Sequence, residues 1–435
     1  MTSPTWQHIF FAVGLFAVLS NDNDHQLSKQ SQKAAAESGA RMMLPTVVEQ
    51  AVLRLIQSKA ATSQIELARA LKLRPNTVHG IVKRLMADGF ISTEKTVRGS
   101  RGRPSLHFTI TLPGKVLVIQ LLGTEWRGAI IGANREQENA GVVTMHSSIF
   151  SDLTESRSFF LQIRDRALAG ANCRLEELQG IMVSTNAVKR PESGLLSSSV
   201  TPWISELSED YLTKLLGAPT LVSTQGKLAE LELRTWTRDG IRSLVRFNVG
   251  DGASSHYASL FGPASMAESF PGEIGHVQRK TGGEICGCGN RGCLETLIAG
   301  PRMLRRLRLD LDSGLQTVLR KSADKSPAEF FQDLYLADQE GQDAYARTLA
   351  TEFLEHCAWG LSISINMFRP QLVVLDGYAL AGHPLWLNRL ESLLPGLVLN
   401  GGPTDYRLVF SRQKPLDLIL ELAAEFFMRQ KGIAL

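Results

Sequence analysis

Cysteine is scarce in this sequence, with five residues in a chain of 435. Three of the five lie between positions 286 and 293, so a disulfide framework there would leave one thiol unpaired. Nothing else in the chain indicates an oxidising compartment. The cysteine content therefore argues against a disulfide-stapled protein and directs attention to this one cluster.

Long apolar runs are also lacking. Residues 9–19 are apolar, but this run is too short to span a bilayer as a helix. No Lys or Arg precedes it and no small-residue cleavage site follows it, which argues against a signal peptide. Residues 1–43 are therefore expected to be a variable or disordered extension of a cytoplasmic protein with no membrane partner. The alternative is an over-extended translation start, with Met42 or Met43 near the true beginning.

Charge is modest overall but unevenly distributed. Charged residues make up 21% of the chain and the net charge is +4. Residues 44–111 hold eleven Lys and Arg against four Asp and Glu, while residues 112–435 carry a net negative charge. This asymmetry indicates a polyanion-binding module joined to a neutral or acidic body.

Residues 44–111 have the pattern of a winged helix-turn-helix. A first helix is expected over residues 45–58. The second begins at a capping box formed by Ser63 and Glu66, and Pro75 suits the first turn of a third helix. The residues expected to face inward from the three helices are Val48, Val52, Leu55, Ile56, Ile65, Ala68, Leu71, Val78, Ile81, Val82 and Leu85.

The outward face of the third helix carries polar and basic side chains. Helix-turn-helix geometry places the start of this helix in the major groove of DNA. We expect Asn76, Thr77 and His79 to read base edges. Lys83 and Arg84 are expected to contact phosphates. A double-stranded DNA operator is thus the predicted partner of this module.

A β-hairpin should follow the third helix. Residues 90–93 and 106–110 alternate like paired strands, and residues 97–105 form the tip between them. The tip sets three arginines among glycine and proline, and such a tip can enter a minor groove. These arginines are Arg98, Arg101 and Arg103. The alternative is a solvated basic loop on an ordinary small helical domain.

Residues 112–435 alternate between strand and helix patterns, which predicts an α/β body. A hairpin is expected at 116–122 and 127–132. Further strands are expected at 178–184, 243–249 and 372–375. The expected helices are 159–169, 303–319 with a break at Ser313-Gly314, 344–367 and 416–429.

The cysteine cluster has the composition of a metal site. His276, Cys286, Cys288 and Cys293 supply one imidazole and three thiolates, a full tetrahedral set for a structural Zn²⁺. Glycines at 287, 289 and 292 suit the tight turns that aim each sulfur inward. The alternative is a turn with unligated cysteines.

Two motifs in this region carry a family resemblance. GEIGH at 272–276 and CGCGNRGCLE at 286–295 resemble the signature of the ROK family of bacterial sugar kinases and sugar-responsive repressors. The resemblance implies a two-lobed, actin-like (ribonuclease H-like) sugar kinase fold, with zinc in the second lobe. It also implies that His276 serves both zinc and sugar, while Glu273 and Glu295 reach sugar hydroxyls.

The resemblance also implies domain limits. The kinase-like domain would cover residues 112–435. Its first lobe would comprise residues 112–238 and the C-terminal helix, and its second lobe residues 239–415. Repressors of this family carry a winged helix before the body, with Gly-Arg-Pro in the wing, as at 102–104 here.

The residues that kinases of this family need are largely replaced. Gln120 and Leu122 stand where the first phosphate-binding turn has Asp and Gly. Ser223 and Thr224 stand where an Asn-Asp pair would supply the general base, and a hydroxyl has too high a pKa for that task. A glycine-containing turn survives at 248–252. The sequence therefore predicts a protein that is not an enzyme.

These patterns together predict a DNA-binding transcriptional regulator, a repressor that responds to a sugar or sugar phosphate. It is expected to form a homodimer or homotetramer, because an operator palindrome mirrors a two-fold axis. One alternative is an active ATP-dependent sugar kinase with an appended DNA-binding domain. Another is a ligand-independent DNA-binding dimer.

Overall fold

The structure is a computed structural model of the 435-residue chain. The residues that it describes are 46–57, 61–95, 106–111, 114–122, 125–132, 142–146, 153–185, 187–189, 195–198, 202–260, 267–399, 406–412, 418–419 and 421–423.

The N-terminal part is a three-helix unit followed by a hairpin, as the sequence predicts. Ser63 caps α3 in a complete capping box with Glu66. Lys72 ends that helix in the left-handed region, with φ of 53°, and Pro75 opens α4. The elements are α2 (Val47–Gln57), α3 (Gln64–Leu71), α4 (Pro75–Ala87), β1 (Ile91–Lys95) and β2 (Leu106–Ile110), the two strands being antiparallel.

Two predicted core positions in these helices are wrong. Ile65 is 71% exposed and Val48 is 42% exposed, whereas Leu53 and Leu67 are fully buried. On α3 the buried stripe passes through Leu67 and Ala68, and Ile65 lies well outside it around the helix. The stripe on α2 likewise leaves Val48 at its edge. Spacing alone did not locate the centre of either stripe.

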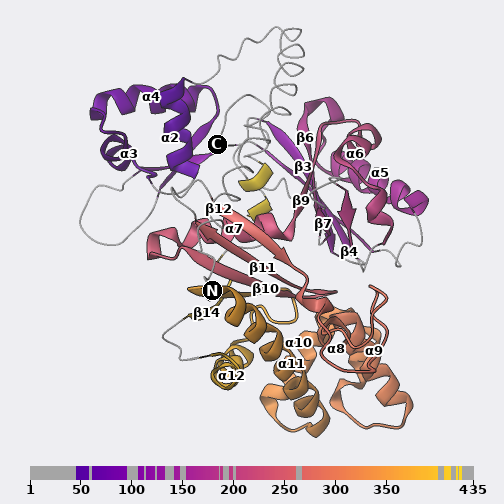
Figure 1. Ribbon diagram of the computed structural model, residues 1–435. Helices are drawn as coiled ribbons and strands as arrows, with labels where there is room; N and C mark the ends of the chain where they lie inside the picture. Colours follow the sequence, from indigo (N-terminus) through magenta and orange to yellow (C-terminus); the bar gives the residue numbers. More distant parts are fainter. Residues whose placement is uncertain are drawn as a thin grey trace, which may run out of the picture.

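The body contains two five-stranded sheets, seen one above the other in Figure 1. The first sheet comprises β3 (Lys115–Leu122), β4 (Glu125–Ile131), β5 (Val143–His146), β6 (Leu178–Thr185) and β9 (Thr220–Thr224). The second comprises β10 (Ser243–Val249), β11 (Ala253–Leu260), β12 (Ala267–Gly272), β13 (Leu372–Asp376) and β14 (Arg407–Phe410). A small hairpin pairs β7 (Val188–Lys189) with β8 (Leu196–Ser197).

The two sheets repeat one topology. The strand orders are β5-β4-β3-β6-β9 and β12-β11-β10-β13-β14. In each, three consecutive strands form an antiparallel meander. One later strand pairs in parallel with the first strand of the meander, and a second later strand pairs in parallel with that one. The fold is thus two related α/β lobes behind a winged helix-turn-helix, although no repeat is visible in the sequence.

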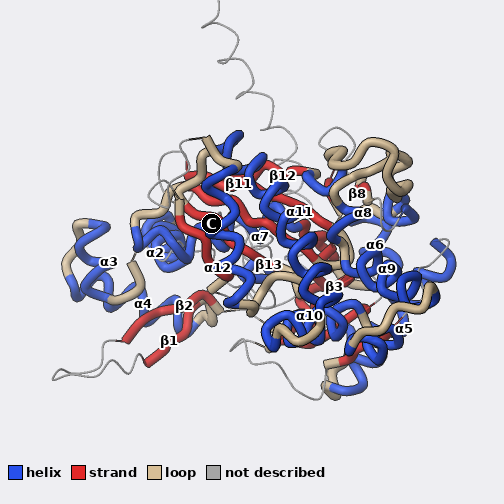
Figure 2. The backbone as a smooth tube through the Cα atoms, turned by 90° about the horizontal axis from the view of Figure 1, so that it is seen from below, coloured by secondary structure: helices blue, strands red, loops and turns tan. Residues whose placement is uncertain are grey.

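Helices cover the sheets and join the lobes (Figure 2). Lobe one carries α5 (Leu153–Gly170), η2 (Leu175–Glu177), η3 (Pro202–Glu206) and α6 (Glu209–Leu216). The lobes are joined by α7 (Gln225–Trp236) and η4 (Thr237–Asp239). Lobe two carries η5 (Ile274–His276), α8 (Glu295–Ile298), α9 (Gly300–Asp312), η6 (Val318–Asp324), α10 (Pro327–Glu340), α11 (Ala344–Phe368), α12 (Pro384–Leu393) and η7 (Leu394–Gly396).

The predicted helix over 303–319 is shorter than expected. Helix α9 ends at Asp312, and Gly314 follows with φ of 94°, so the expected break at Ser313-Gly314 is confirmed. A separate 3-10 turn takes up 318–324. Of the predicted final helix, residues 418–419 and 421–423 are described and are helical, and the remainder lies outside the described residues.

Within the described part of the chain, no helix is both long and apolar enough to cross a membrane. The apolar side chains are buried in packed cores. One core joins the winged helix to lobe one, through Ile110, Val116, Met182 and Ile419 among others. Another fills lobe two beneath α11. The winged helix is therefore packed onto the body through shared apolar contacts.

Candidate functional site

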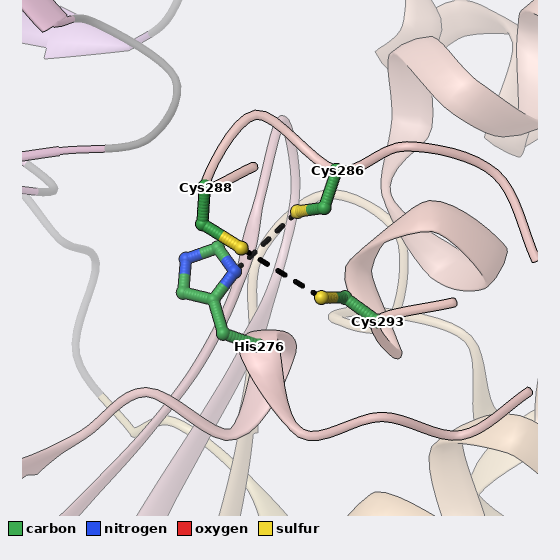
Figure 3. A group of neighbouring side chains, drawn as sticks. All are labelled: His276, Cys286, Cys288 and Cys293. Atoms are coloured by element: carbon green, nitrogen blue, oxygen red, sulfur yellow. Dashed lines mark hydrogen bonds between the residues drawn. The ribbon is translucent and has the colours of Figure 1, made fainter. Parts of the chain in front are cut away.

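The four predicted metal ligands converge on one point in lobe two (Figure 3). His276 ends η5, and the three cysteines lie on the loop that precedes α8. One donor atom from each of the four lies within 4.8 Å of the others. Nδ1 of His276 is 3.5 Å from Sγ of Cys286, and Sγ of Cys288 is 3.7 Å from Sγ of Cys293.

Local backbone geometry explains how the loop brings the sulfurs together. Gly289 and Gly292 adopt φ of 91° and 70°, a region that L side chains avoid. A Cβ on Gly292 would lie 1.6 Å from the Lys280 carbonyl oxygen, so only glycine fits there. Gly287 lies in the predicted turn, which the Gly289 amide closes on the Cys286 carbonyl, but it does so without a positive φ. The Cys286 amide donates to the Asn290 carbonyl and closes the turn.

The spacing of these atoms fits a tetrahedral metal site. Sulfurs about 2.3 Å from one zinc ion would lie about 3.7 Å apart, whereas a disulfide needs about 2.05 Å. All five cysteines are free thiols. Burial raises the pKa of Cys286 to about 12. A bound cation would supply the charge that holds such a thiol as thiolate, so the cluster could hold a metal ion.

Two acidic residues flank the cluster. Oε2 of Glu273 is 3.6 Å from Nε2 of His276, on the ring edge opposite the sulfurs. Buried Glu295 accepts a hydrogen bond from the Ala253 amide at 3.2 Å and one from the Cys286 thiol at 3.7 Å. The pKa of Glu273 is raised above its usual value, mainly because the side chain is partly buried. His276 lowers this pKa and Glu295 raises it further. The sugar-binding candidates therefore adjoin the metal ligands.

The residues that replace the expected catalytic and phosphate-binding residues of a kinase lie near strand ends in lobe one. Ser223 is buried near the end of β9, and Thr224 is the N-cap residue of α7 without a side-chain cap bond. Gln120 is buried in β3, pairing with Arg127 and Ser184. The side chain of Leu122 lies outside the described residues.

A tyrosine that sequence reasoning missed covers the surviving glycine turn. The Tyr378 ring would lie 3.3 Å from a Cβ on Gly250, and its hydroxyl donates to Asp251 at 2.6 Å. The Gly300 amide donates to the Gly250 carbonyl, and a Cβ on Gly300 would also meet this ring. Tyr378 follows Asp376-Gly377 at the end of a parallel strand, which is where α/β folds bind ligands. This position after the strand could have identified Tyr378 from the sequence.

A buried ion pair adjoins this tyrosine. Arg246 on β10 pairs with Asp376 on β13, and Asn248 donates to the same carboxylate at 3.0 Å. Both charged side chains are nearly inaccessible to solvent. The protein's own side chains therefore fill the region between the glycine turn and the end of β13.

The predicted DNA-facing residues lie together on α4. All five are exposed, and they are Asn76, Thr77, His79, Lys83 and Arg84. The Arg84 Nε also donates to Glu49 of α2 at 2.9 Å, an ion pair that the sequence did not indicate. Arg98, Arg101 and Arg103 of the wing tip lie outside the described residues.

Comparison with known proteins agrees with this architecture. Residues 217–414 match the model of the ROK family, and residues 48–92 match a winged helix-turn-helix DNA-binding model. The chain is similar to the DNA-binding transcriptional repressor Mlc of Escherichia coli, with 26% identity over 75% of this chain and 79% of Mlc. It is also similar to the xylose repressor of Caldicellulosiruptor bescii, with 22% identity over 82% of this chain and 89% of that protein.

A solved structure shares the fold. It is a ROK family transcriptional regulator described as a homologue of Escherichia coli Mlc, with a TM-score of 0.63 and 19% identity, covering 89% of this chain and 98% of that chain. A ROK family glucokinase from Streptomyces griseus aligns over 72% of this chain and 99% of its own, with a TM-score of 0.53 and 18% identity. The chain thus carries a domain that matches the ROK family over residues 217–414, and a winged helix-turn-helix domain precedes it.

Proposed function

We propose that this protein is a sequence-specific transcriptional repressor that responds to a sugar or sugar derivative through a catalytically inactive kinase-like domain. The observation that carries the proposal is the exposed polar face of α4 on a winged helix that packs onto the kinase-like body. The resemblance adds that Ser223 and Thr224 stand where a kinase would have its base. The similarity to two proteins named as repressors supports it. In this proposal residues 44–111 bind DNA and residues 112–435 sense the ligand.

The DNA-binding roles follow from position on α4. Asn76, Thr77 and His79 lie in its first two turns and read base edges. Lys83 contacts phosphate, and Arg84 does so with the nitrogens that Glu49 leaves available. Arg98, Arg101 and Arg103 at the wing tip add minor-groove contacts. DNA as the partner places the protein's action in the bacterial cytoplasm.

The metal in this proposal is a structural Zn²⁺ held by His276, Cys286, Cys288 and Cys293. Four protein ligands close the coordination shell, so the ion serves as a cross-link between η5 and the loop before α8. The contact between Glu273 and Nε2 of His276 supports the assignment of Nδ1 as the ligand atom, because an outer carboxylate fixes the ring orientation.

The same brace holds the sugar-binding residues. Glu273 and Glu295 offer carboxylate oxygens to sugar hydroxyls, and His276 contributes the ring nitrogen that zinc leaves unused. Glu295 is positioned by the Ala253 amide, so its orientation does not depend on the ligand. The ligand class in this proposal is a sugar or sugar phosphate.

We propose no phosphotransfer. A sugar kinase needs a carboxylate to take the proton from the attacking hydroxyl, and the residues at that place are Ser223 and Thr224. Tyr378 also lies over the turn at Gly250, where a nucleotide phosphate would have to approach the backbone. An active sugar kinase is the alternative, and phosphorylation of a hexose by the purified protein would establish it.

Assembly as a homodimer or homotetramer is part of the proposal. A two-fold axis places two recognition helices about 34–36 Å apart on an imperfect palindrome. A ligand that binds one lobe arrangement more tightly would change that spacing and release the operator. A sedimentation measurement that finds a monomer at working concentration would rule out this arrangement.

The deciding experiment is operator selection from genomic fragments with the purified full-length chain, followed by titration with a panel of sugars and sugar phosphates. Binding to a discrete fragment that weakens steeply with salt is expected, because each phosphate contact releases counterions. Binding with no sequence preference would refute the proposal. Operator binding without heat from any sugar in calorimetry would favour the ligand-independent dimer.

A further inference from the structure

Helix α7 contacts both lobes and is buried on nearly every side. Leu228 and Leu231 belong to the apolar core that contains the winged helix and the described C-terminal residues. Ala229, Leu233 and Trp236 belong to a separate core that lines the lobe-two sheet. A helix that is apolar on opposite faces is a shared element of two cores. Strands β11 and β12 pack along it (Figure 1).

One polar contact ties α7 to the strand that leads into the sugar and zinc site. Ser269 on β12 donates to Oε1 of Glu230 at 2.9 Å, and Lys227 pairs with the other carboxylate oxygen. Four residues after Ser269 comes Glu273, and β12 ends at the residue before it. A displacement of Glu273 therefore reaches α7 through one short strand.

A second polar contact ties α7 to the C-terminal segment. Glu232 is fully buried, and its carboxylate accepts from the Ser411 hydroxyl at 2.6 Å and the Trp236 indole at 2.9 Å. The Arg412 guanidinium stacks 3.3 Å from the Trp236 ring centroid. Leu418, a few residues further on, is packed in the same core as the winged helix. Glu232 thus holds Ser411 on α7, and Leu418 lies in the core that contains the winged helix.

We propose that α7 is the element that couples the zinc lobe to the winged helix, with Glu230 and Glu232 as the positioning residues at its two connections. The inference rests on the proposed function and identifies the helix through which a change at the sugar and zinc site reaches the DNA-binding domain. Packed helices move as rigid bodies, because their cores resist continuous deformation. A shift of β12 that reaches Glu230 therefore moves Leu228, Leu231 and the Glu232 anchor together.

The test is hydrogen exchange on the full-length, zinc-loaded protein. Ser269→Ala removes the β12 connection, and Glu232→Gln weakens the C-terminal one. Ser322→Ala is the matched control, since it breaks a 2.6 Å hydrogen bond from buried Ser322 to Asp333, between η6 and α10 of lobe two, that involves neither α7 nor the strands packed along it. Exchange is followed in peptides that cover α2 and α4.

Both test variants should speed exchange in α2 and α4 by about threefold or more, the effect expected of a coupling residue that touches no ligand. Ser322→Ala should change exchange only within lobe two. Unchanged exchange in α2 and α4 of the Ser269→Ala protein, or an equal change there in the Ser322→Ala protein, would overturn the proposal. Ser269→Ala alone decides if Glu232→Gln does not fold.

This outcome is separable from that of the proposed function. Operator binding is measured on the same preparations. A wild-type chain that binds no DNA refutes the repressor, whereas the exchange pattern still reports on α7. If the protein binds its operator but exchange in α2 and α4 is unchanged in Ser269→Ala and Glu232→Gln, the proposed function stands and the coupling is refuted.

Discussion

The Tyr378 hydroxyl donates a 2.6 Å hydrogen bond to Asp251, and its ring lies against Gly250 and Gly300. Burial, together with the Asp251 carboxylate, raises the pKa of Tyr378 far above its usual value, so the phenol remains a donor at any working pH. The glycine turn is therefore held by the protein's own side chain.

This contact predicts a graded response to substitution. Tyr378→Phe keeps the ring and loses one hydrogen bond to a charged group, a cost of about 1.5–3 kcal/mol. The melting temperature of the full chain should fall by several degrees. Tyr378→Ala should fall further, because a cavity opens beside Gly250. Calorimetric scans check both variants, and equal melting temperatures for wild type and Tyr378→Phe would contradict the assigned bond.

The metal cluster predicts a localised effect of ligand loss. Cys288→Ser should abolish stoichiometric zinc and destabilise lobe two, because structural zinc sites contribute on the order of 10–16 kcal/mol in small domains. Cys173→Ser is the control, since Cys173 lies in the core of lobe one and its thiol donates to the Arg174 carbonyl. Metal analysis and thermal scans check the pair. A Cys288→Ser protein that stays folded without metal would remove the structural role.

Local chemistry made the winged helix and the cysteine cluster predictable. Each of these features depends on residues close together in the sequence. The structure confirms the Ser63 capping box, the helix start at Pro75 and the two strands of the hairpin. The four ligands lie within one short stretch, so spacing alone predicts that they meet. The burial of Ile65 was predicted wrongly because two short faces of α3 fit the same spacing.

Long-range relationships were not predictable in the same way. Tyr378 and Asp251 are separated by 127 positions, and Ser411 and Glu232 by 179. No local pattern records such a pairing. The matched topologies of the two sheets also escape the sequence, because strand order depends on crossovers rather than on residue identity.

The assigned roles on α4 predict two different DNA-binding defects. Asn76→Ala should cost about 1–3 kcal/mol at the operator and relax preference at one base position, because an amide reads a base edge. Lys83→Ala should weaken all sequences alike and lower the salt slope by about one. Fluorescence anisotropy across a salt series separates them. Identical salt slopes for Lys83→Ala and wild type would contradict the phosphate contact.

The Glu49–Arg84 pair predicts acid sensitivity of the winged helix. Burial alone would raise the pKa of Glu49, but the Thr46 amide and Arg84 together lower it below its usual value. A depressed folded pKa adds stability above the unfolded pKa, and that stability is lost as pH falls through the folded pKa. Glu49→Gln should therefore lower the melting temperature of the winged helix by several degrees at pH 7.

The difference in melting temperature between wild type and Glu49→Gln should shrink as pH falls from about 4.5 through the lowered pKa of Glu49, because protonated Glu49 is neutral, as Gln is at every pH. Arg69→Gln is the control, because Arg69 is an exposed residue of the neighbouring helix α3 and its replacement changes the net charge by the same amount in the opposite direction. Calorimetric scans from about pH 3 to pH 7 measure the series. A difference that persists unchanged at the acidic end would show that Glu49 acts through packing and not through its charge.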